Sequence, residues 1–425
     1  MGFKRVKGLS GEVNVPGDKS ISHRSIMLGS LAKGTTEVYG FLQGADCLSS
    51  IDCFRKMGVE ITNQDGIVTI KGRGLHGLLE PKDTLDVGNS GTTTRLMSGI
   101  LAAQNFTSRI NGDASIQKRP MKRIITPLAM MGADIRSELS NDCAPLIING
   151  KKLTGIHYDS PVASAQVKSA ILLAGLYAEG ETSVTEPAVS RNHTELMFEE
   201  FGVDVRTEGK TAIVKPANEL FARKVIVPGD ISSATYFMVA AAITPNSCVT
   251  VKNVGVNPTR DGIIRVCRMM GADIQVEFTS KDVGEPTADI TVNTSNLKGC
   301  TIGGDIIPTL IDEIPAIAIL ACFATGTTII KDAQELKVKE SNRIDVVVNN
   351  LKKMGADIEA TDDGMIITGG KTLTGAVIDS KLDHRIAMSF AIAGMNADGE
   401  TEILGSECVD ISYPEFYRDL ESLIK

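Results

Sequence analysis

Apolar and polar residues along this chain follow a pattern that recurs every roughly 70 to 85 residues. The clearest mark of the pattern is the segment Met-Gly-Ala-Asp-Ile, which occurs at 131–135, 270–274 and 354–358. Degenerate copies stand at 57–61 and 201–205. Self-similarity at a fixed period indicates one supersecondary unit used repeatedly, so we expect an internally repeated fold.

Each copy of the segment predicts a helix that ends at a glycine. In residues 46–57, for example, Leu48, Ile51, Phe54 and Met57 lie on one helical face. The glycine that follows readily adopts the left-handed conformation that closes a helix. Alternating residues after it predict a strand and, in most copies, a β-hairpin.

A second set of helices is rich in Ala, Leu and Ile, and each begins with a polar cluster. The six openings are Asp18-Lys19-Ser20, Asn89-Ser90-Gly91-Thr92, Ser164-Ala165-Gln166, Asp230-Ile231-Ser232-Ser233, Asp312-Glu313 and Asp383-His384-Arg385. Four of the helices lead into a glycine turn and a Thr/Val strand, at Gly34, Gly180, Gly326 and Gly399. The predicted unit is β-α-β-α-β-β, present six times, which is an α/β fold.

A repeated tetrapeptide predicts the domain boundaries. Val15-Pro16-Gly17-Asp18 and Val227-Pro228-Gly229-Asp230 are identical and about three units apart. We therefore expect crossovers near 15–18 and 227–230, and two three-unit domains, 17–227 and 1–16 together with 228–425. The sixth unit lacks its final strands, and we expect residues 1–16 to supply them.

Composition narrows the classes of function. The net charge of −8 gives no support for a nucleic-acid or anionic-membrane surface. The eight Cys form no C-x-x-C pair and the five His are isolated, so we expect no metal site and buried thiols in a reducing cytosol. Residues 1–6 resemble the start of a strand and lack the apolar region of a signal peptide, so we expect no signal peptide. Apolar runs such as 314–324 are shorter than the ~20 residues of a membrane span, so we expect a cytoplasmic protein.

Cations gather at the helix openings despite the acidic balance. They are Lys19, Arg24, Arg119, Arg191, Lys339, Arg343 and Arg385. Helix N-termini carry free N–H groups and partial positive charge, so several of them together with these cations predict a site for polyanionic ligands. A phosphate loop of the Walker type does not fit, because Asp18 separates Gly17 from Lys19. We interpret His384 as a structural histidine rather than a base.

In these polar clusters the chain resembles the 5-enolpyruvylshikimate-3-phosphate synthase family of enolpyruvyl transferases, in its bacterial branch. The segments that carry the resemblance are Pro16 to Arg24, Gly88 to Arg95, Gly112 to Met121, Ser164 to Ser169, Ser190 to Glu195, Lys339 to Arg343 and Asp383 to Arg385. They span essentially the whole chain. The resemblance implies a two-domain inside-out α/β barrel with three repeats per domain, closing over a cleft at the crossovers.

The resemblance also implies the reaction and its ligands. Phosphoenolpyruvate and shikimate 3-phosphate would be joined with release of phosphate, without metal or organic cofactor. Phosphoenolpyruvate would be bound by Lys19, Gly91, Arg119, Gln166, Arg343 and Arg385. Shikimate 3-phosphate would be bound by Lys19, Ser20, Arg24, Ser164, Gln166, Arg191, Asp312 and Lys339. Asp312 would be the base and Glu340 the acid, with Lys19 or Lys339 assisting. Because Gly91 leaves space, we expect inhibition by glyphosate.

One position departs from the family pattern, and two alternatives stay open. The family often has a lysine before the C-terminal Ser-Tyr-Pro segment, where this chain has Asp410-Ile411. A UDP-N-acetylglucosamine enolpyruvyl transferase would share the fold, but it normally carries a catalytic cysteine that 112–121 lacks. A non-catalytic anion-binding relative is the second alternative. We expect a monomer whose partners are small molecules, without nucleic acid or membrane.

Overall fold

The computed structural model describes residues 1–280 and 284–425. The chain forms two compact units, Gly17–Val227 and Met1–Pro16 with Pro228–Lys425. Each unit has its own hydrophobic core. Both division points fall inside the repeated Val-Pro-Gly-Asp segments.

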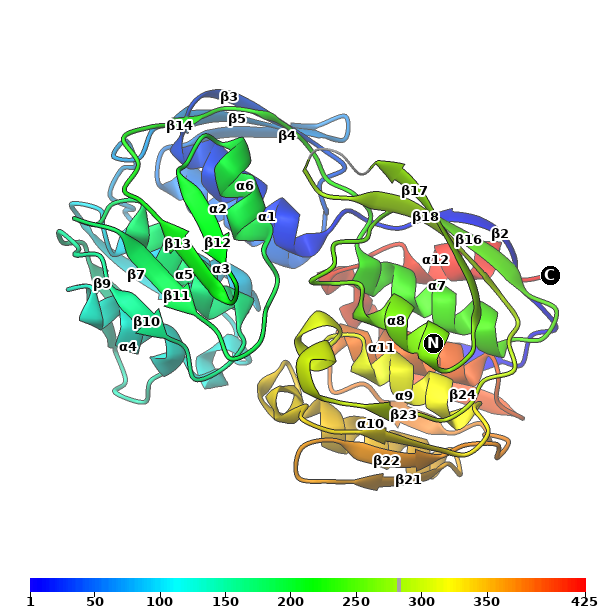
Figure 1. Ribbon diagram of the computed structural model, residues 1–425. Coiled ribbons are helices and arrows are strands. Elements are labelled where there is room, and N and C mark those ends of the chain that lie inside the picture. Colours follow the sequence, from blue (N-terminus) through cyan, green and yellow to red (C-terminus); the bar gives the residue numbers. More distant parts are fainter. Residues whose placement is uncertain (281–283) are drawn as a thin grey trace. The chain divides into compact units, whose positions relative to one another are not determined.

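In the Gly17–Val227 unit, three sheets lie around three largely buried helices (Figure 1). These inner helices are α1 (Lys19–Leu31), α3 (Gly91–Leu101) and α5 (Ala165–Gly175). The sheet orders are β14-β3-β5-β4 with β15 also on β3, β6-β7-β9-β8, and β10-β11-β13-β12. The strands are β3 (Ala32–Tyr39), β4 (Glu60–Gln64), β5 (Ile67–Arg73), β6 (Leu85–Asp86), β7 (Thr107–Asn111), β8 (Asp134–Ser137), β9 (Leu146–Asn149), β10 (His157–Asp159), β11 (Thr182–Thr185), β12 (Val205–Glu208), β13 (Thr211–Val214), β14 (Leu220–Phe221) and β15 (Lys224–Ile226).

The other unit repeats this plan around α7 (Ile231–Ile243), α9 (Ile314–Cys322) and α11 (His384–Gly394), in which every residue is buried. The sheet orders are β17-β18-β16-β2, β19-β20-β22-β21 and β1-β24-β23. The strands are β1 (Gly2–Lys4), β2 (Ser10–Asn14), β16 (Cys248–Gly255), β17 (Asp273–Ser280), β18 (Thr287–Asn293), β19 (Thr301–Ile302), β20 (Thr327–Ile330), β21 (Asp357–Ala360), β22 (Met365–Thr368), β23 (Val377–Asp379) and β24 (Glu400–Leu404).

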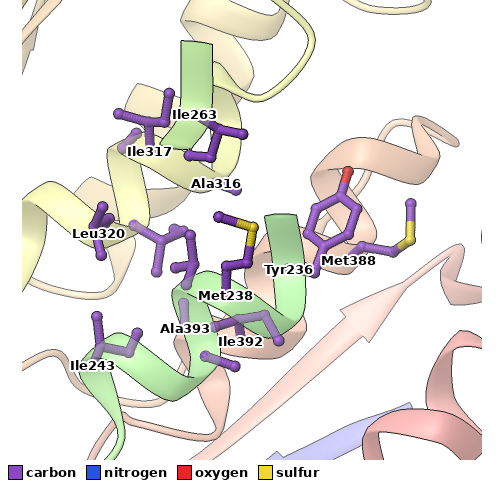
Figure 2. Packing of buried hydrophobic residues seen from close by; sticks show 14 of the residues in the cluster. Tyr236, Met238, Ile243, Ile263, Ala316, Ile317, Leu320, Met388, Ile392 and Ala393 are labelled. Atoms are coloured by element: carbon purple, nitrogen blue, oxygen red, sulfur yellow. The ribbon is translucent and has the colours of Figure 1, made fainter. Parts of the chain in front are cut away.

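Close packing among these inner helices explains why they are apolar on all sides. Figure 2 shows Met238 of α7 among Leu320 of α9 and Ile392 of α11. A helix that is hydrophobic all round is typical of a buried position, because it has no face for solvent. Small residues such as Ala316 and Ala393 let the helices approach closely.

In five of the six repeats, the second helix packs against the hairpin that follows it and ends as the sequence predicts. These helices are α2 (Ala45–Lys56), α4 (Lys122–Met130), α6 (His193–Glu200), α8 (Gly262–Met269) and α10 (Arg343–Lys353). The glycines after them have φ of 83°, 95°, 85°, 81° and 82°. At the first, Gly58 N–H donates to the Arg55 carbonyl and Val59 N–H to the Phe54 carbonyl, which is a Schellman motif. The same pair of bonds closes the other four helices.

The predicted unit is confirmed, as in β6-α3-β7-α4-β8-β9. At the crossovers the structure adds the strand pairings, which the sequence does not reveal. Strand β2, which precedes α1, pairs with β16, while β15, which precedes α7, pairs with β3. Each domain's first helix is thus preceded by a strand that belongs to the other domain's sheet.

The prediction for the sixth unit is only partly right. Of residues 1–16, strand β1 alone extends the sixth sheet, by pairing antiparallel with β24. Strand β2 joins β16 instead, so the sixth sheet has three strands. A 3-10 helix, η4 (Ser406–Ile411), and α12 (Phe416–Ser422) follow β24. Further 3-10 helices are η1 (Ile116–Lys118), η2 (Gly304–Thr309) and η3 (Gln334–Val338).

Candidate functional site

The polar helix openings act as N-caps at four of the six inner helices. The side chains of Asp18, Ser90, Asp230 and Asp383 accept backbone N–H bonds from the first turns of α1, α3, α7 and α11. The cap residue of α5, Ser164, makes no side-chain cap bond. The Ser164 hydroxyl therefore accepts no hydrogen bond from the first-turn N–H groups of α5. An anion site at a helix start requires such groups to be available to the ligand.

Lys19 opens α1 in the Gly17–Val227 unit and pairs with an acidic residue of the next helix. Its Nζ lies 2.5 Å from Asp46 Oδ2, and the two side chains are 17% and 8% exposed. Sequence reasoning did not single out Asp46, because the contact joins two helices. The pair gives Lys19 a fixed position, with its side chain still partly exposed.

Arg24 is more deeply engaged with the protein than the sequence suggests. Its Nε donates to Thr194 Oγ1 at 2.7 Å, and its Nη2 donates to Ser169 Oγ at 2.7 Å. Its Nη1 donates to the Ser20 carbonyl at 2.9 Å. The Ser20 hydroxyl in turn lies 3.5 Å from Arg191 Nη1. Arg24 thus ties α1 to α5 and α6 beneath Ser20 and Arg191.

Gly91 and Gln166 share a neighbour that the sequence did not single out, Arg95. Arg95 Nη1 donates to Gln166 Oε1 at 2.6 Å, and Gln166 Nε2 donates to Thr92 Oγ1 at 3.0 Å. A Cβ on Gly91 would meet Arg95 Nη1 at 2.8 Å and Arg119 Nη1 at 3.2 Å. The missing side chain therefore leaves room for two guanidinium groups.

Arg119 also lies at the start of α3, where its side chain donates hydrogen bonds to two polar side chains. Its Nη2 donates to Asn89 Oδ1 at 2.5 Å and to Ser115 Oγ at 3.2 Å. Asp113 accepts the backbone N–H groups of Ser115 and Ile116, both at 2.9 Å, and so shapes the turn that presents Arg119. No cysteine lies in 112–121.

In the Pro228–Lys425 part, Asp312 is the centre of a group of cations. Its Oδ1 lies 3.2 Å from Lys339 Nζ and 3.3 Å from Arg343 Nη1. Arg385 Nη2 lies 3.8 Å from Asp312 Oδ2. All four residues were predicted to belong to the site, and the structure brings them together. The predicted acid Glu340 joins them through Arg343 Nη2, at 2.6 Å.

Arg343 is buried, with a side chain only 1% exposed, and Asp383 holds it from behind. Its Nε and Nη2 donate to the two Asp383 oxygens at 2.8 and 3.2 Å. Burial alone lowers the pKa of the Arg343 guanidinium, but Asp383 and Glu340 outweigh burial and raise it above its ordinary value. At Arg385, burial also lowers the pKa of the guanidinium. The negative charges of Asp312 and neighbouring acidic groups outweigh burial, so the pKa of Arg385 is raised above its ordinary value. Both arginines are therefore permanent cations.

The segment that departs from the family pattern belongs to the core. Ile411 packs against the cluster of the Pro228–Lys425 part. Tyr413 is fully buried and its hydroxyl donates to Asp419 Oδ2 at 2.9 Å, while Phe416 contacts the rings of Tyr236 and Tyr413. This segment supports α7 and α11 by packing.

The expectation that the thiols are buried is only partly right. Five of the eight free cysteines are buried, but Cys143 and Cys300 are half-buried and Cys248 is exposed. Among the residues that the structure describes, no helix is long and apolar enough to cross a membrane. Within the same residues, no three His, Cys, Asp or Glu side chains are grouped as metal ligands would be.

Comparison with known proteins relates the chain to one family over its whole length. A model of the EPSP synthase (3-phosphoshikimate 1-carboxyvinyltransferase) family matches residues 3–420. The chain is 59% identical over 418 residues to the 3-phosphoshikimate 1-carboxyvinyltransferase of Bacillus thuringiensis subsp. konkukian, which covers 98% of this chain and 97% of that protein. It is 58% identical over 421 residues to the protein of the same name from Bacillus cytotoxicus, with 99% of each covered. A solved EPSP synthase from Acinetobacter baumannii superposes with a TM-score of 0.88 at 49% identity, covering 100% of this chain and 98% of that one.

Proposed function

The chain belongs to the EPSP synthase family, and we propose that it transfers the enolpyruvyl group of phosphoenolpyruvate to the 5-hydroxyl of shikimate 3-phosphate, releasing phosphate. The observation that carries this proposal is the group of Lys339, Arg343 and Arg385 around Asp312. In this group, fixed cations that can bind an anionic substrate surround one carboxylate that can accept a proton.

Phosphoenolpyruvate has two anionic ends, and we assign a different set of residues to each. Lys19, Arg119 and Gln166 would hold its phosphate, with Gly91 leaving room beside them. Arg343 and Arg385 would bind its carboxylate, because planar guanidinium groups can form paired bonds to a carboxylate. Arg343 already donates to three protein carboxylates, so a ligand carboxylate would take over part of these bonds.

For shikimate 3-phosphate we propose a subsite around the starts of α1 and α5. Ser164, with its hydroxyl not used as a cap, and Arg191 would bind the phosphate. Ser20 and Arg24 would lie on the carboxylate side, with Arg24 mainly holding Ser20 and Thr194 in place. Lys19, Gln166, Asp312 and Lys339 complete the proposed contacts.

The proposed chemistry is an addition followed by an elimination. Asp312 takes the proton of the 5-hydroxyl, whose oxygen attacks the carbon that carries the phosphate, while Glu340 protonates the methylene carbon. Lys19 and Lys339 stabilise the negative charge that develops as this tetrahedral intermediate expels phosphate. Glu340, left as a carboxylate by the first step, then takes a proton from the methyl group, and the enolpyruvyl double bond forms again.

Two further expectations complete the proposal. Both substrates are phosphorylated anions that do not cross a lipid bilayer unaided, so we place the reaction in the cytoplasm. We propose a monomeric enzyme whose partners are its two small-molecule substrates.

The UDP-N-acetylglucosamine transferase remains the alternative to test. The loop where that enzyme carries its cysteine is occupied here by Asp113 and Ser115, which shape the η1 turn and hold Arg119. This favours the shikimate 3-phosphate reaction.

Phosphate release by the purified full chain tests the proposal. Phosphoenolpyruvate would be supplied with either shikimate 3-phosphate or UDP-N-acetylglucosamine, and we expect release with the first alone. Asp312→Asn should lower kcat about 10²–10⁴-fold, as for loss of a general base. Asp362→Asn, an exposed aspartate of the same unit, is the control and should be fully active. Release with the nucleotide sugar, or binding of both ligands without release, would overturn the proposal.

A further inference from the structure

A buried ion triad lies beneath the proposed phosphate subsite of the Gly17–Val227 unit. Lys168, on α5, places its Nζ 3.0 Å from Glu186 Oε2 and 2.7 Å from Glu195 Oε1. The three side chains are 4%, 2% and 7% exposed. Glu186 follows β11 and Glu195 lies in the first turn of α6. None of these residues takes part in the chemistry proposed above.

Glu186 connects two segments that the proposed function assigns to the phosphate. Its Oε1 accepts the backbone N–H of Ser164 at 3.0 Å and the hydroxyl of Ser190 at 2.7 Å. Its Oε2 lies 3.3 Å from the backbone N of Ser190, which also donates to it. Ser164 begins α5, and Ser190 directly precedes Arg191. One carboxylate therefore fixes the spacing between the two phosphate-binding segments.

Charge explains why a lysine is needed at the centre. Two buried carboxylates without Lys168 would place a charge of about −2 beside a bound phosphate, which like-charge repulsion disfavours. With Lys168 the triad carries about −1. Burial works against the Lys168 ammonium, but Glu195 and Glu186 outweigh it and raise the pKa of Lys168, so the lysine remains charged.

Stability alone does not account for the triad. Buried ion groups are often no more stabilising than well-packed apolar residues of similar volume. A carboxylate with several N–H and O–H donors, in contrast, holds backbone segments in one geometry. That is the property that a site for a phosphate requires.

We propose that Lys168, Glu186 and Glu195 form a positioning triad that sets Ser164 and the Ser190-Arg191 segment for the 3-phosphate of the acceptor substrate. Glu186 acts through its bonds to both segments, and Lys168 keeps its charge from repelling the ligand. The inference rests on the proposed function, since it takes shikimate 3-phosphate as the acceptor.

The test compares shikimate 3-phosphate with shikimate, because the two differ only in the phosphate. Binding of each to the full chain would be measured by titration calorimetry for wild type, Lys168→Met and Glu186→Gln. The matched control is Lys215→Met, which removes an exposed lysine paired with Asp204 in the same unit. Thermal unfolding of every variant identifies any loss of folded protein.

We expect Lys168→Met to weaken shikimate 3-phosphate binding about tenfold or more, while shikimate binding changes less than about twofold. Glu186→Gln keeps one acceptor oxygen and should weaken the phosphate ligand less. In turnover, KM for shikimate 3-phosphate should rise while KM for phosphoenolpyruvate stays within about twofold. Lys215→Met should match wild type.

Equal weakening of both ligands would mean that the triad is merely structural, and unchanged binding of both would mean that it has no role at the site. Either result overturns the inference. If wild type binds shikimate 3-phosphate and the selective loss is seen without any phosphate release, the proposed reaction fails while the triad stands. If wild type does not bind shikimate 3-phosphate, both fail.

Discussion

Arg343→Lys preserves the charge of a fully buried cation, whose side chain is 1% exposed, and removes its planar array of donors. Arg343 makes four hydrogen bonds to three carboxylates, those of Asp383, Glu340 and Asp312. Lysine has three donors on a single nitrogen and a shorter reach to each side. It cannot satisfy all three carboxylates from one position.

The structure sets the scale of the loss. If two of the four charge-assisted bonds are lost, at about 1.5–3 kcal/mol each, unfolding becomes easier by about 3–6 kcal/mol. This agrees with the about 3–5 kcal/mol expected when a buried ion pair is broken. For a unit of this size, a loss of that order lowers Tm by about 6–24 °C.

The measurement is thermal and denaturant unfolding followed by circular dichroism, since the chain has no tryptophan. Arg418→Lys is the matched control, because Arg418 is 68% exposed on the same part of the chain and also faces two carboxylates. It should leave Tm unchanged. Equal Tm values for the two variants would refute the reasoning from buried donor geometry. The kcat/KM for phosphoenolpyruvate should also fall for Arg343→Lys alone.

Four further changes test other parts of the account. Lys19→Ala should abolish turnover by removing a fixed cation, and near-normal phosphate release would remove Lys19 from the mechanism. Gly91→Ala forces Arg95 to move, because the new Cβ would lie 2.8 Å from its Nη1, and an inhibition assay should show glyphosate losing potency more than turnover falls. Equal losses would contradict this. Gly271→Ala should lower the free energy of unfolding by about 1–2 kcal/mol, because alanine is strained at a φ of +81° although there is space for its Cβ. An unchanged free energy in denaturant unfolding would show that this backbone conformation causes no strain. Burial, together with the charges of Lys19 and Arg24, lowers the pKa of His23 well below its ordinary value of 6.5. The contribution of neutral His23 to the free energy of unfolding is therefore complete above pH 6.5. It decreases below pH 6.5 by at most about 1.4 kcal/mol per pH unit. In His23→Asn that part of the pH dependence of unfolding should vanish, and an unchanged slope would assign it to other groups.

Local signals predicted the repeated parts of the fold well. A glycine after an amphipathic helix commonly closes the helix in the left-handed conformation, and all five such glycines do so here. The six inner helices begin at or within two residues of their predicted polar openings. These features depend on neighbours in sequence, which a pattern can reveal.

Long-range pairings could not be predicted in the same way. Strand β2 joins β16 and strand β15 joins β3. Which strand edge is free to accept each of them depends on the assembled domain and not on neighbours in sequence. The contacts of Lys19 with Asp46 and of Gln166 with Arg95 join different helices. The sequence placed Asp312, Lys339, Arg343 and Arg385 in one site only by their repeat positions and the family resemblance. Their common geometry around one carboxylate emerges from the structure.

The fate of the bridging oxygen of phosphoenolpyruvate tests the proposed reaction most directly. Attack of the 5-hydroxyl on carbon and expulsion of phosphate break the carbon–oxygen bond, so the bridging oxygen leaves with the phosphate. Phosphoenolpyruvate carrying a heavy oxygen isotope at that position would be incubated with shikimate 3-phosphate and the full chain, and both products analysed by mass spectrometry. The proposed reaction predicts that the label appears in phosphate and that the acceptor gains an enolpyruvyl group. Label retained in pyruvate, with the acceptor unchanged, would contradict it.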